Sequence, residues 1–547
     1  MSAFQDHARG ASNLGCTVSW TRASKELLDE IMERELRSLK EEFAKSPDRG
    51  AAQLSPPPSD TPIEVRTEYT TPTIISPGSQ QPMISARVLD NIWIGPQVIH
   101  ELLEEYYTHY HVLFPILPEL PAFLESYASF DVLFWTVIAI ACGGLSEHSD
   151  LYIRLKNPVE RLLTDINHPA SHSFPQIQAL LLICSWPFPF GPIDTDPSWT
   201  YCGLATHYAL RLGLHRPAHT ADFRYDTVYD QETMMARQKA WIACFIINQG
   251  ISTKLGIPST VRVDNSILGT LTSLPSWLPE VLCRQLFIAY QVNRFTITLG
   301  NHEKTSTGLF PEPTPMIRMF DKDLRMAETR FESTSPPMEL AMLLGARLSL
   351  YSFVFGAEDS GENSPLDTIN TNNEILSQAY ITIMQLLKVA VSPDAGIIYW
   401  TALCRGHIYF SVFFLLKLIK YPTYSFVDEI AARNIINQAW ERLKSCSAGE
   451  GDHLSRICAI IQFLGTGSES QVRGGPLLVV KSRMSANIYR DAVWRAKKRF
   501  SGIVQDQHPE DYTTAESLLQ NGPMELFSTP YLEGILPDLG FLSGNFE

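Results

Sequence analysis

The stretch from Asp194 to Pro217 constrains the fold of this chain more than any other, because it has the features of one short helix with defined ends. Asp196 is placed to cap the free amides of the first turn, and Pro197 suits the first helical position, where no N–H is needed. Small and apolar residues recur on one face at helical spacing: Cys202, Ala205, Ala209 and Leu212. Gly203 in mid-helix costs about 1 kcal/mol relative to alanine, which a close approach by another helix would offset. Gly213 supplies a left-handed end, so the pattern predicts a buried scaffold helix.

A small set of residues in this stretch carries a family resemblance: Trp199, Tyr201, Gly203, Ala205, Ala209 and the run Leu212-Gly213-Leu214-His215-Arg216. The set resembles the signature of the fungal-specific transcription factor domain, the large regulatory region in the middle of fungal binuclear zinc-cluster activators. The resemblance extends from about Trp93 to about Ile461. It implies a nuclear regulator of RNA polymerase II transcription, and it is the strongest functional signal in the chain.

A second block resembles the same family. Its residues begin a helix and continue into a short loop: Glu232, Arg237, Lys239, Trp241, Asn248, Gln249, Gly256 and Pro258. Where the family commonly shows an Asp-Arg pair, this chain has the neutral Asn248 and Gln249, and Ile257 replaces an arginine. Neutral amides can hydrogen-bond without the desolvation cost of buried charges. This variant is most similar to the subgroup that includes the leucine-biosynthesis and weak-acid-response activators.

The basic residues of both blocks could contact DNA, contact an effector or form ion pairs within the fold: Arg211, His215, Arg216, Arg237 and Lys239. Pairing with acids such as Glu232 is favoured, because basic side chains on helices usually face water or a carboxylate. A group of aromatic residues is a candidate lining for a small-metabolite pocket: Trp186, Phe188, Phe190, Trp199 and Tyr201. Packing in the core explains these aromatic residues equally well.

Composition agrees with a large helical body. The chain has 547 residues, of which 45% are hydrophobic and 19% are charged, so it can bury a sizeable core. Its net charge of −15 argues against a protein that coats nucleic acid by itself, since phosphate binding needs a basic face. Continuous strand alternation is scarce. The sequence therefore predicts an all-α fold: a large multi-helix regulatory domain with a short N-terminal amphipathic helix and a disordered linker and tail.

The nine cysteines are scattered and form no C-x-x-C pair, which is typical of reduced, buried thiols inside the cell. His168 and His172 flank a proline that breaks the helix needed to align them, so we reject a metal site there. The longest apolar runs, 132–142 and 408–416, are shorter than the roughly 20 residues of a membrane span. The N-terminus lacks a secretory pattern. We expect a soluble protein with no membrane partner and no cofactor in this chain.

A helix that opens at Ser24 and runs to residue 46 carries a narrow apolar stripe: Leu28, Met32, Leu36, Leu39 and Phe43. The stripe predicts either a coiled coil that pairs two subunits or a short helix docked on its own body, and the resemblance favours a homo- or heterodimer. The family's zinc cluster needs six closely spaced cysteines upstream, yet only Cys16 precedes Ser24. Either the gene model begins late or the DNA-reading module has been lost. Promoter DNA is therefore a partner at the family level and not of this chain alone.

Composition shifts divide the rest of the chain. Residues 1–23 are polar and 47–92 are rich in Pro, Ser and Thr, so we expect a disordered N-terminus and a linker, followed by the regulatory body at 93–503. A dense basic cluster near the end of this body is either a nuclear import signal or the cationic end of a helix: Arg495, Lys497, Lys498 and Arg499.

The tail 504–547 contains acidic residues but no lysine or arginine, with bulky apolar residues between them: Phe527, Tyr531, Leu532, Leu536, Leu539 and Phe541. Such a segment stays solvated and can dock in a coactivator groove on folding. The favoured hypothesis is a transcription regulator whose body senses a metabolite or a partner and whose tail recruits coactivators. A co-regulator that lacks a DNA module and heterodimerises through the 24–46 helix is the alternative.

An enzyme is the rival class of protein. The sequence has no phosphate loop, no G-x-S-x-G turn, no H-E-x-x-H helix and no complete dinucleotide fingerprint. We therefore predict that the chain is not an enzyme.

Overall fold

The computed structural model describes residues 84–126, 129–165, 173–189, 196–223, 229–330, 336–356, 366–420, 426–449, 451–466 and 478–506. Within them, a short hairpin precedes a long series of helices. In chain order the elements are β1 (Arg87–Leu89), β2 (Ile92–Ile94), α2 (Pro96–Glu105), η1 (Tyr106–Tyr110), η2 (His111–Leu113), α3 (Leu120–Ser126), α4 (Asp131–Cys142), η3 (Ser146–His148), α5 (Ser149–Thr164), α6 (Phe174–Ser185), α7 (Ser198–Arg211), η5 (Pro217–Asp222), α8 (Gln231–Leu255), α9 (Asn265–Ser273), α10 (Glu280–Gly300), α11 (Thr314–Arg330), α12 (Pro337–Tyr351), η6 (Ser352–Gly356), α13 (Leu366–Val391), η7 (Pro393–Ala395), α14 (Ala402–Lys420), α15 (Glu429–Ser445), α16 (His453–Thr466), η8 (Met484–Ala486) and α17 (Asn487–Asp506).

The described residues are helical apart from this hairpin and the connecting loops, which confirms the predicted all-α class. β1 and β2 pair antiparallel with Val88 opposite Trp93, and the turn between them passes through Asp90 at φ 51°. Ile92 and Ile94 are buried, whereas Trp93 is 67% exposed. Because side chains alternate along a strand, the two isoleucines anchor the hairpin on the helices that follow.

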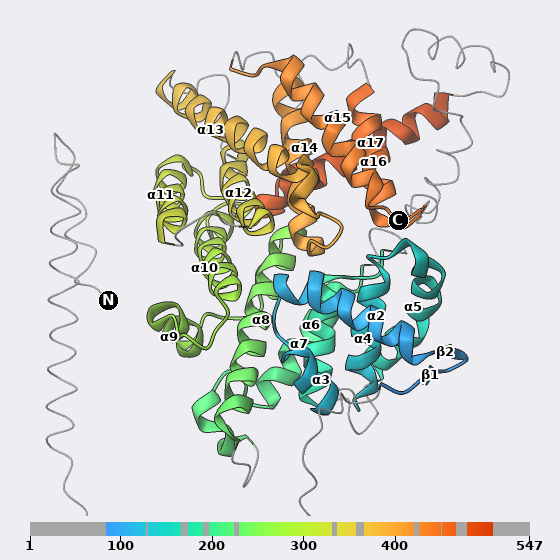
Figure 1. Cartoon of the computed structure of the whole chain (residues 1–547). Helices are drawn as coiled ribbons and strands as arrows, with labels where there is room; N and C mark the ends of the chain where they lie inside the picture. Colours follow the sequence, from blue (N-terminus) through green and yellow to red (C-terminus); the bar gives the residue numbers. More distant parts are fainter. Residues whose placement is uncertain are drawn as a thin grey trace, which may run out of the picture. The chain divides into compact units, whose positions relative to one another are not determined.

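Two hydrophobic cores organise the helices. The first includes the hairpin, helices α2 to α9, and Leu282 and Leu286 from the beginning of α10. The second begins at Ile288 and Val292 on the same helix and continues to α17. Figure 1 shows helices α2 to α7, coloured blue to green, gathered apart from helices α12 to α17, coloured yellow to red, with α8 and α10 between the two groups. The helix α10 therefore contributes to both cores.

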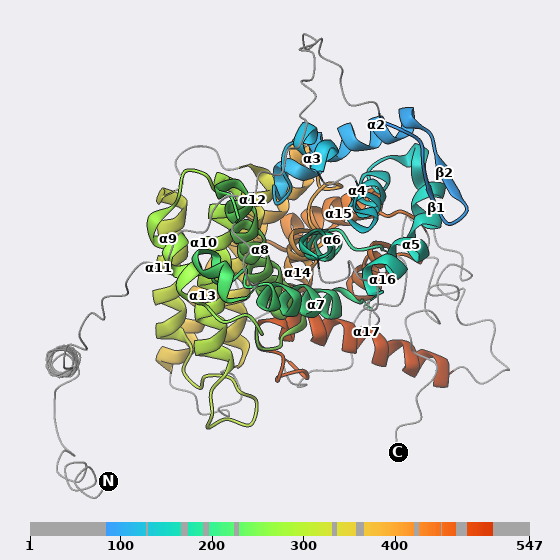
Figure 2. The ribbon, with the colours of Figure 1, turned by 90° about the horizontal axis from the view of Figure 1, so that it is seen from below.

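Helices α6 and α14 lie in the interior, with other helices around them in Figure 2. Every residue of α6 from Pro175 to Ser185 is buried. Three segments are long and apolar enough to cross a membrane, namely 337–356, 372–391 and 402–420, and 89%, 44% and 67% of their most apolar windows are buried inside the protein. They are longer than the apolar runs 132–142 and 408–416 because polar residues are included within them. Packing in the cores accounts for the composition of the first and third segments, whereas less than half of the 372–391 window is buried.

The helix predicted in the Asp194–Pro217 stretch is α7. It begins at Ser198, one residue later than expected, so Pro197 precedes the first helical residue. Asp196 accepts the amide of Ser198 at 2.9 Å, and its second oxygen pairs with the ammonium of Lys254 at 3.2 Å. Asp196 therefore satisfies one free amide at the start of α7 while it contacts the end of α8.

The C-terminal end of α7 is closed by glycine, as predicted. Gly213 has a φ of 73°. The amide of Gly213 donates to the carbonyl oxygen of Leu210 at 3.0 Å. The amide of Leu214 donates to the carbonyl oxygen of Ala209 at 2.9 Å. This pair of bonds is the Schellman arrangement of a helix that ends at a left-handed residue.

Gly203 corrects one expectation. A Cβ atom at this position would meet nothing within 4 Å, so the close helix contact predicted for Gly203 is wrong. The small residues Cys202 and Ala205 lie on the buried face of α7, each with 0% exposure. A close approach occurs instead at Gly256, where φ is 67° and a Cβ atom would lie 2.1 Å from the carbonyl oxygen of Arg483. That position requires glycine for both its backbone conformation and its space.

Several predictions concern residues outside the described ranges. They are the segments 1–23 and 24–46 with the apolar stripe of the latter, most of the linker 47–92, the pair His168 and His172, Phe190, and the tail after residue 506. For these segments and residues the sequence-based expectations remain predictions.

Candidate functional site

One buried asparagine fastens the loop after α8 to that helix. Asn248 has 0% exposure. Its Oδ1 atom accepts the Ser259 hydroxyl at 2.8 Å and the amides of Thr260 and Val261 at 2.9 and 3.2 Å. Its Nδ2 atom donates to Oγ1 of Thr260 at 2.7 Å. Both ends of the side-chain amide are therefore engaged in holding the loop.

The neighbouring Gln249 joins α8 to α10. Its Oε1 atom accepts Nδ2 of Asn293 at 2.8 Å, and its Nε2 atom donates to Oγ1 of Thr253 at 3.1 Å. Gln249 and Asn293 are both buried. The two amides at the family's Asp-Arg position thus bind different neighbours. Asn248 binds the loop after α8, and Gln249 binds Asn293 on α10.

Arg237 is 3% exposed and supports the end of α7. Its Nη2 atom donates to the carbonyl oxygen of Leu212, and its guanidinium lies 4.4 Å from the centre of the Tyr229 ring. A cation at the carboxyl end of a helix is favoured by the helix dipole. Glu232 is exposed on the first turn of α8, and Lys239 is partly buried. Burial lowers the pKa of the Lys239 ammonium.

Trp241 links α8 to the start of α9. Its Nε1 atom donates to Oδ2 of Asp264 at 3.0 Å, and Oδ1 of the same carboxylate caps α9 by accepting the amide of Ile267 at 2.9 Å. The ring of His215 lies 5.8 Å from that of Trp241, and burial lowers the pKa of His215. Arg216 is exposed.

The motif residues therefore form a scaffold that caps, packs and hydrogen-bonds helices α7 to α10. Tyr201 and Ala205 are buried in the first core, and Pro258 is exposed on the loop. Trp199 lines a small cavity of about 30 Å³, whereas Gln249 lines a larger one described next. The structure does not gather the whole set around one pocket.

A first cavity, the apolar cavity, lies where the two cores meet. Its volume is about 110 Å³. It is lined by residues of α8, α10, α12, α14 and α17. Most of the lining is aliphatic or aromatic, as at Ile247, Val292 and Phe410. The hydroxyl of Ser485 also lines it and has no hydrogen-bond partner among the described residues.

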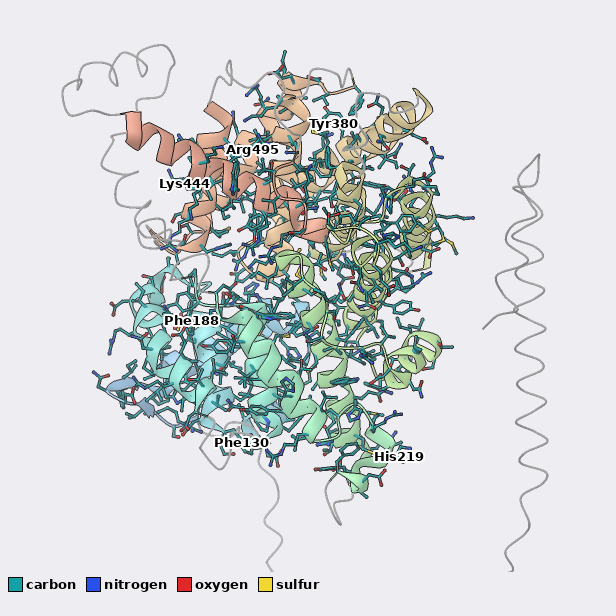
Figure 3. All side chains as sticks on the ribbon, turned by 180° about the vertical axis from the view of Figure 1, so that it is seen from behind. Phe130, Phe188, His219, Tyr380, Lys444 and Arg495 are labelled. Atoms are coloured by element: carbon teal, nitrogen blue, oxygen red, sulfur yellow. The ribbon has the colours of Figure 1, made fainter. Side chains whose placement is uncertain are left out.

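A second cavity of about 110 Å³, the polar cavity, lies beside the start of α14 and is lined by Arg405, Lys254, Asp196, Asp452 and His453 together with aromatic rings. The aromatic residues include Trp186 and Phe188, two of those predicted to line a metabolite pocket. Phe188 is labelled in Figure 3. Tyr201 is not part of this lining.

Arg405 carries the main unpaired charge of the polar cavity. Its side chain donates to the carbonyl oxygen of Ile398 at 3.1 Å and forms no ion pair with any residue that the structure describes. Burial raises the pKa of the Tyr110 and Tyr409 hydroxyls, and the charge of Arg405 opposes that rise at both. Burial, with a contribution from Lys254, lowers the pKa of His453 to about 3, so this imidazole is neutral at physiological pH.

The basic cluster near the chain end lies on α17. Nε of Arg495 donates to Oδ2 of Asp491 at 2.7 Å, and the ammonium of Lys417 on α14 binds the same oxygen at 2.9 Å. Asp491 is 1% exposed, so this ion-pair group ties α17 to the second core. Lys498 lies 5.1 Å from the centre of the Trp494 ring. Figure 3 labels Arg495 on the ribbon of α17; the side chain of Arg499 is outside the described part.

The residues that sequence reasoning missed are those of the polar cavity: Arg405, Tyr409 and His453. They come from α14 and α16, far from the motif blocks. One signal was available. Arg405 is a charged residue near the start of the apolar segment 400–419, where a buried charge needs a partner.

Comparison with known proteins agrees with the two motif blocks, which lie inside the matched segment. Residues 103–281 match the family described as the fungal specific transcription factor domain. The match begins near the end of α2 and ends at the start of α10. Regulatory protein LEU3 of Saccharomyces cerevisiae is 22% identical over 467 residues, which cover 75% of this chain and 52% of that protein.

Two further relatives are named SEF1. The one from Eremothecium gossypii is 24% identical over 436 residues, 74% of this chain and 40% of that protein. The transcriptional regulatory protein of that name from Candida albicans is 24% identical over 444 residues, 75% of this chain and 46% of that protein. The chain thus spans about half, or less, of the length of these relatives. The matched family and these relatives are transcription factors and not enzymes, in agreement with the class expected from the sequence.

Proposed function

We propose that this chain regulates RNA polymerase II transcription in the nucleus, with its helical body as a sensor and its tail as a coactivator contact. The observation that carries the proposal is the fungal specific transcription factor domain at 103–281. Support for a sensing role comes from the two cavities, because small-molecule sites are usually concave, largely apolar and provided with a few polar groups.

The tail is the proposed activating segment. Its acidic residues keep it solvated, and apolar side chains such as Phe527, Leu532 and Leu536 would dock in a coactivator groove. We propose that promoter recognition uses a zinc-cluster module of the family type, which needs six closely spaced cysteines, whereas residues 1–23 contain Cys16 alone. The helix 24–46 is the proposed site of homo- or heterodimerisation.

A reporter experiment tests the activating role. The full chain is fused to a heterologous DNA-binding domain, and reporter expression is compared with that of a chain ending at residue 503. We expect deletion of the tail to lower expression at least tenfold, and alanine at Phe527, Leu532 and Leu536 to lower it similarly at unchanged protein level. Equal expression from all three proteins would refute the activating role.

The second candidate is a co-regulator that reaches DNA only through a partner subunit. The observation in its favour is the apolar stripe of the predicted helix 24–46, which would pair with the partner subunit. Light scattering of the full chain and of a Leu28→Asp, Leu36→Asp variant tests the dimer helix. We expect the variant to be half the mass of the unmodified chain. A monomeric unmodified chain that also pulls no family member from fungal extract would exclude this candidate.

A further inference from the structure

An open groove, the α9 groove, lies where the loop after α7 meets α9. Its volume is about 410 Å³, against about 110 Å³ for each of the two cavities described above. Several of its lining residues are exposed: Arg216, Ala218, His219, Asn265, Gly269 and Ser273. Figure 3 labels His219, which belongs to η5. The α9 groove is therefore accessible from solvent to a molecule larger than a metabolite.

The lining of the α9 groove carries positive charge. Arg216, His215 and His219 line it, and no aspartate or glutamate is among the described residues that do, although the chain has 59 acidic residues and 44 lysines and arginines. Asp264 precedes α9, but its two oxygens already accept Nε1 of Trp241 and the amide of Ile267. Arg216 is exposed and forms no ion pair with any residue that the structure describes. The α9 groove thus offers a cation to an anionic partner.

Two polar atoms of the lining residues are buried without a hydrogen-bond partner in the described structure. They are Nδ1 of His215 and Oγ of Ser266. The neighbouring Thr270 is engaged, because its Oγ1 atom accepts Nε2 of Gln238 at 3.2 Å and donates to the carbonyl oxygen of Ser266 at 2.8 Å. Buried polar groups without partners are uncommon in folded proteins, so the first two indicate an absent ligand or ordered water.

The number of donors favours a phosphate group over a carboxylate. The guanidinium of one arginine already matches both oxygens of a carboxylate. Beside Arg216, the α9 groove offers the hydroxyl of Ser266 and the side-chain amide of Asn265 from another element. A phosphate monoester has three strong acceptor oxygens and a charge of about −1.5 to −2 at pH 7. It can therefore use donors from the loop after α7 and from α9 together.

The rest of the lining favours a peptide as the carrier of the phosphate. Pro217, Pro275 and the partly buried Trp277 also line the α9 groove. Leu268 and Leu274, next to lining residues in the chain, are 41% and 37% exposed. A nucleic acid backbone would need a broad basic face, whereas this chain has a net charge of −15 and the lining holds a single arginine. A phosphorylated peptide presents one phosphate with apolar neighbours.

We infer that the α9 groove docks a segment of a partner protein that carries phosphoserine or phosphothreonine. The phosphate pairs with the guanidinium of Arg216 and accepts the hydroxyl of Ser266, and the neighbouring peptide residues lie against Pro275 and Trp277. The inference goes beyond the proposed function and does not depend on it, because the α9 groove is separate from both cavities and from the tail.

The test begins with an array of peptides that have phosphoserine at a fixed central position and mixed flanking residues, probed with the full chain. The tightest-binding peptide is then titrated by fluorescence anisotropy, with its serine and glutamate forms as matched controls. We expect the phosphorylated form to bind at least tenfold more tightly than either control. Inorganic phosphate and a short duplex DNA serve as competitors, and each should bind at least tenfold more weakly than the phosphopeptide.

Substitutions identify the α9 groove as the binding site. Arg216→Gln should weaken binding of the phosphopeptide about ten- to hundredfold, the range expected for a charge-assisted pair. Arg216→Lys should give an intermediate loss, because it keeps the charge and lacks the planar fork. Ser266→Ala should weaken binding severalfold. Arg433→Gln removes an exposed arginine that pairs with Glu429, and it should change nothing.

Folding is checked separately from binding. Gly269 lines the α9 groove, and a Cβ atom there would meet nothing within 4 Å. Gly269→Trp should therefore fill the groove and abolish binding without lowering the melting temperature, since it replaces a glycine inside a helix.

Four results would overturn the inference: no phosphopeptide bound on the array, equal affinity for the serine or glutamate form, equal affinity for Arg216→Gln and the unmodified chain, or tighter binding of inorganic phosphate or DNA than of the phosphopeptide. The reporter experiment on the tail is unaffected by any of these results.

Discussion

Replacement of Asn248 by alanine should destabilise the body strongly without touching either cavity. The side chain makes four hydrogen bonds to the loop after α8, at 2.7 to 3.2 Å. Each such bond contributes about 0.5–1.5 kcal/mol. Ser259 and Thr260 reach solvent and can bond to water instead, but Val261 is 3% exposed and its amide would lose its partner. An unsatisfied buried amide costs about 1–3 kcal/mol. We therefore expect a loss of about 3 kcal/mol in the free energy of unfolding.

The assay is equilibrium unfolding of the full chain in guanidinium chloride, followed by circular dichroism. Asn248→Leu serves as a second variant, because it fills the volume that alanine leaves and still lacks the hydrogen bonds. Asn437→Ala, on the exposed face of α15, is the matched control and should change the free energy by less than about 0.5 kcal/mol. Full recovery by Asn248→Leu would show that lost volume was the cause. A loss below about 1 kcal/mol for Asn248→Ala would refute the reasoning altogether.

Three further predictions concern stability. Gly203→Ala should stabilise the chain by about 0.5–1 kcal/mol, because a Cβ there meets nothing within 4 Å; a lower melting temperature would contradict this. Lys417→Met should lower the free energy of unfolding by about 3 kcal/mol, because the buried carboxylate of Asp491 loses one of its cationic partners. The double variant Lys417→Met, Asp491→Leu should lose less than the sum of the two single variants; additive losses would contradict the pairing. The third prediction concerns Asp196. Burial raises its pKa, but Lys254 and the Ser198 amide outweigh burial and lower it to about 2, from 3.8. A depressed carboxyl pKa gives stability that is present above the unfolded value and is lost as pH falls through the folded value. The gap in unfolding midpoint between the unmodified chain and Asp196→Asn should therefore narrow from pH 5 towards pH 2; a constant gap would contradict the assignment.

Local signals in the sequence predicted the ends of α7 well. Gly213 and Asp196 act within a few residues of their own positions, so the sequence contains what their geometry needs. The hairpin was missed, although Asp90 and Asn91 are the kind of residues that a two-residue turn takes. Strands of three residues are too short for alternation to be recognised.

The remaining errors and omissions have a common physical cause. The sequence does not show whether a helical glycine faces a neighbour or open space, and Gly203 faces open space. Arg237 donates to the backbone carbonyl of Leu212. Every residue has such a carbonyl, so the residue type does not show which one will act as the acceptor. The polar cavity assembles residues from Tyr110 to Leu454, and only tertiary packing brings Arg405 to His453.

Because α10 contributes to both cores, it limits where this chain can be truncated. The family match ends at residue 281, yet the first core still needs Leu282 and Leu286 from the helix that starts at Glu280. A fragment that stops at the end of the match would leave a stripe of aliphatic side chains without a cover and would aggregate. A fragment that holds the first core therefore has to include all of α10 and the residues that cover its other face, which in practice means the entire helical body.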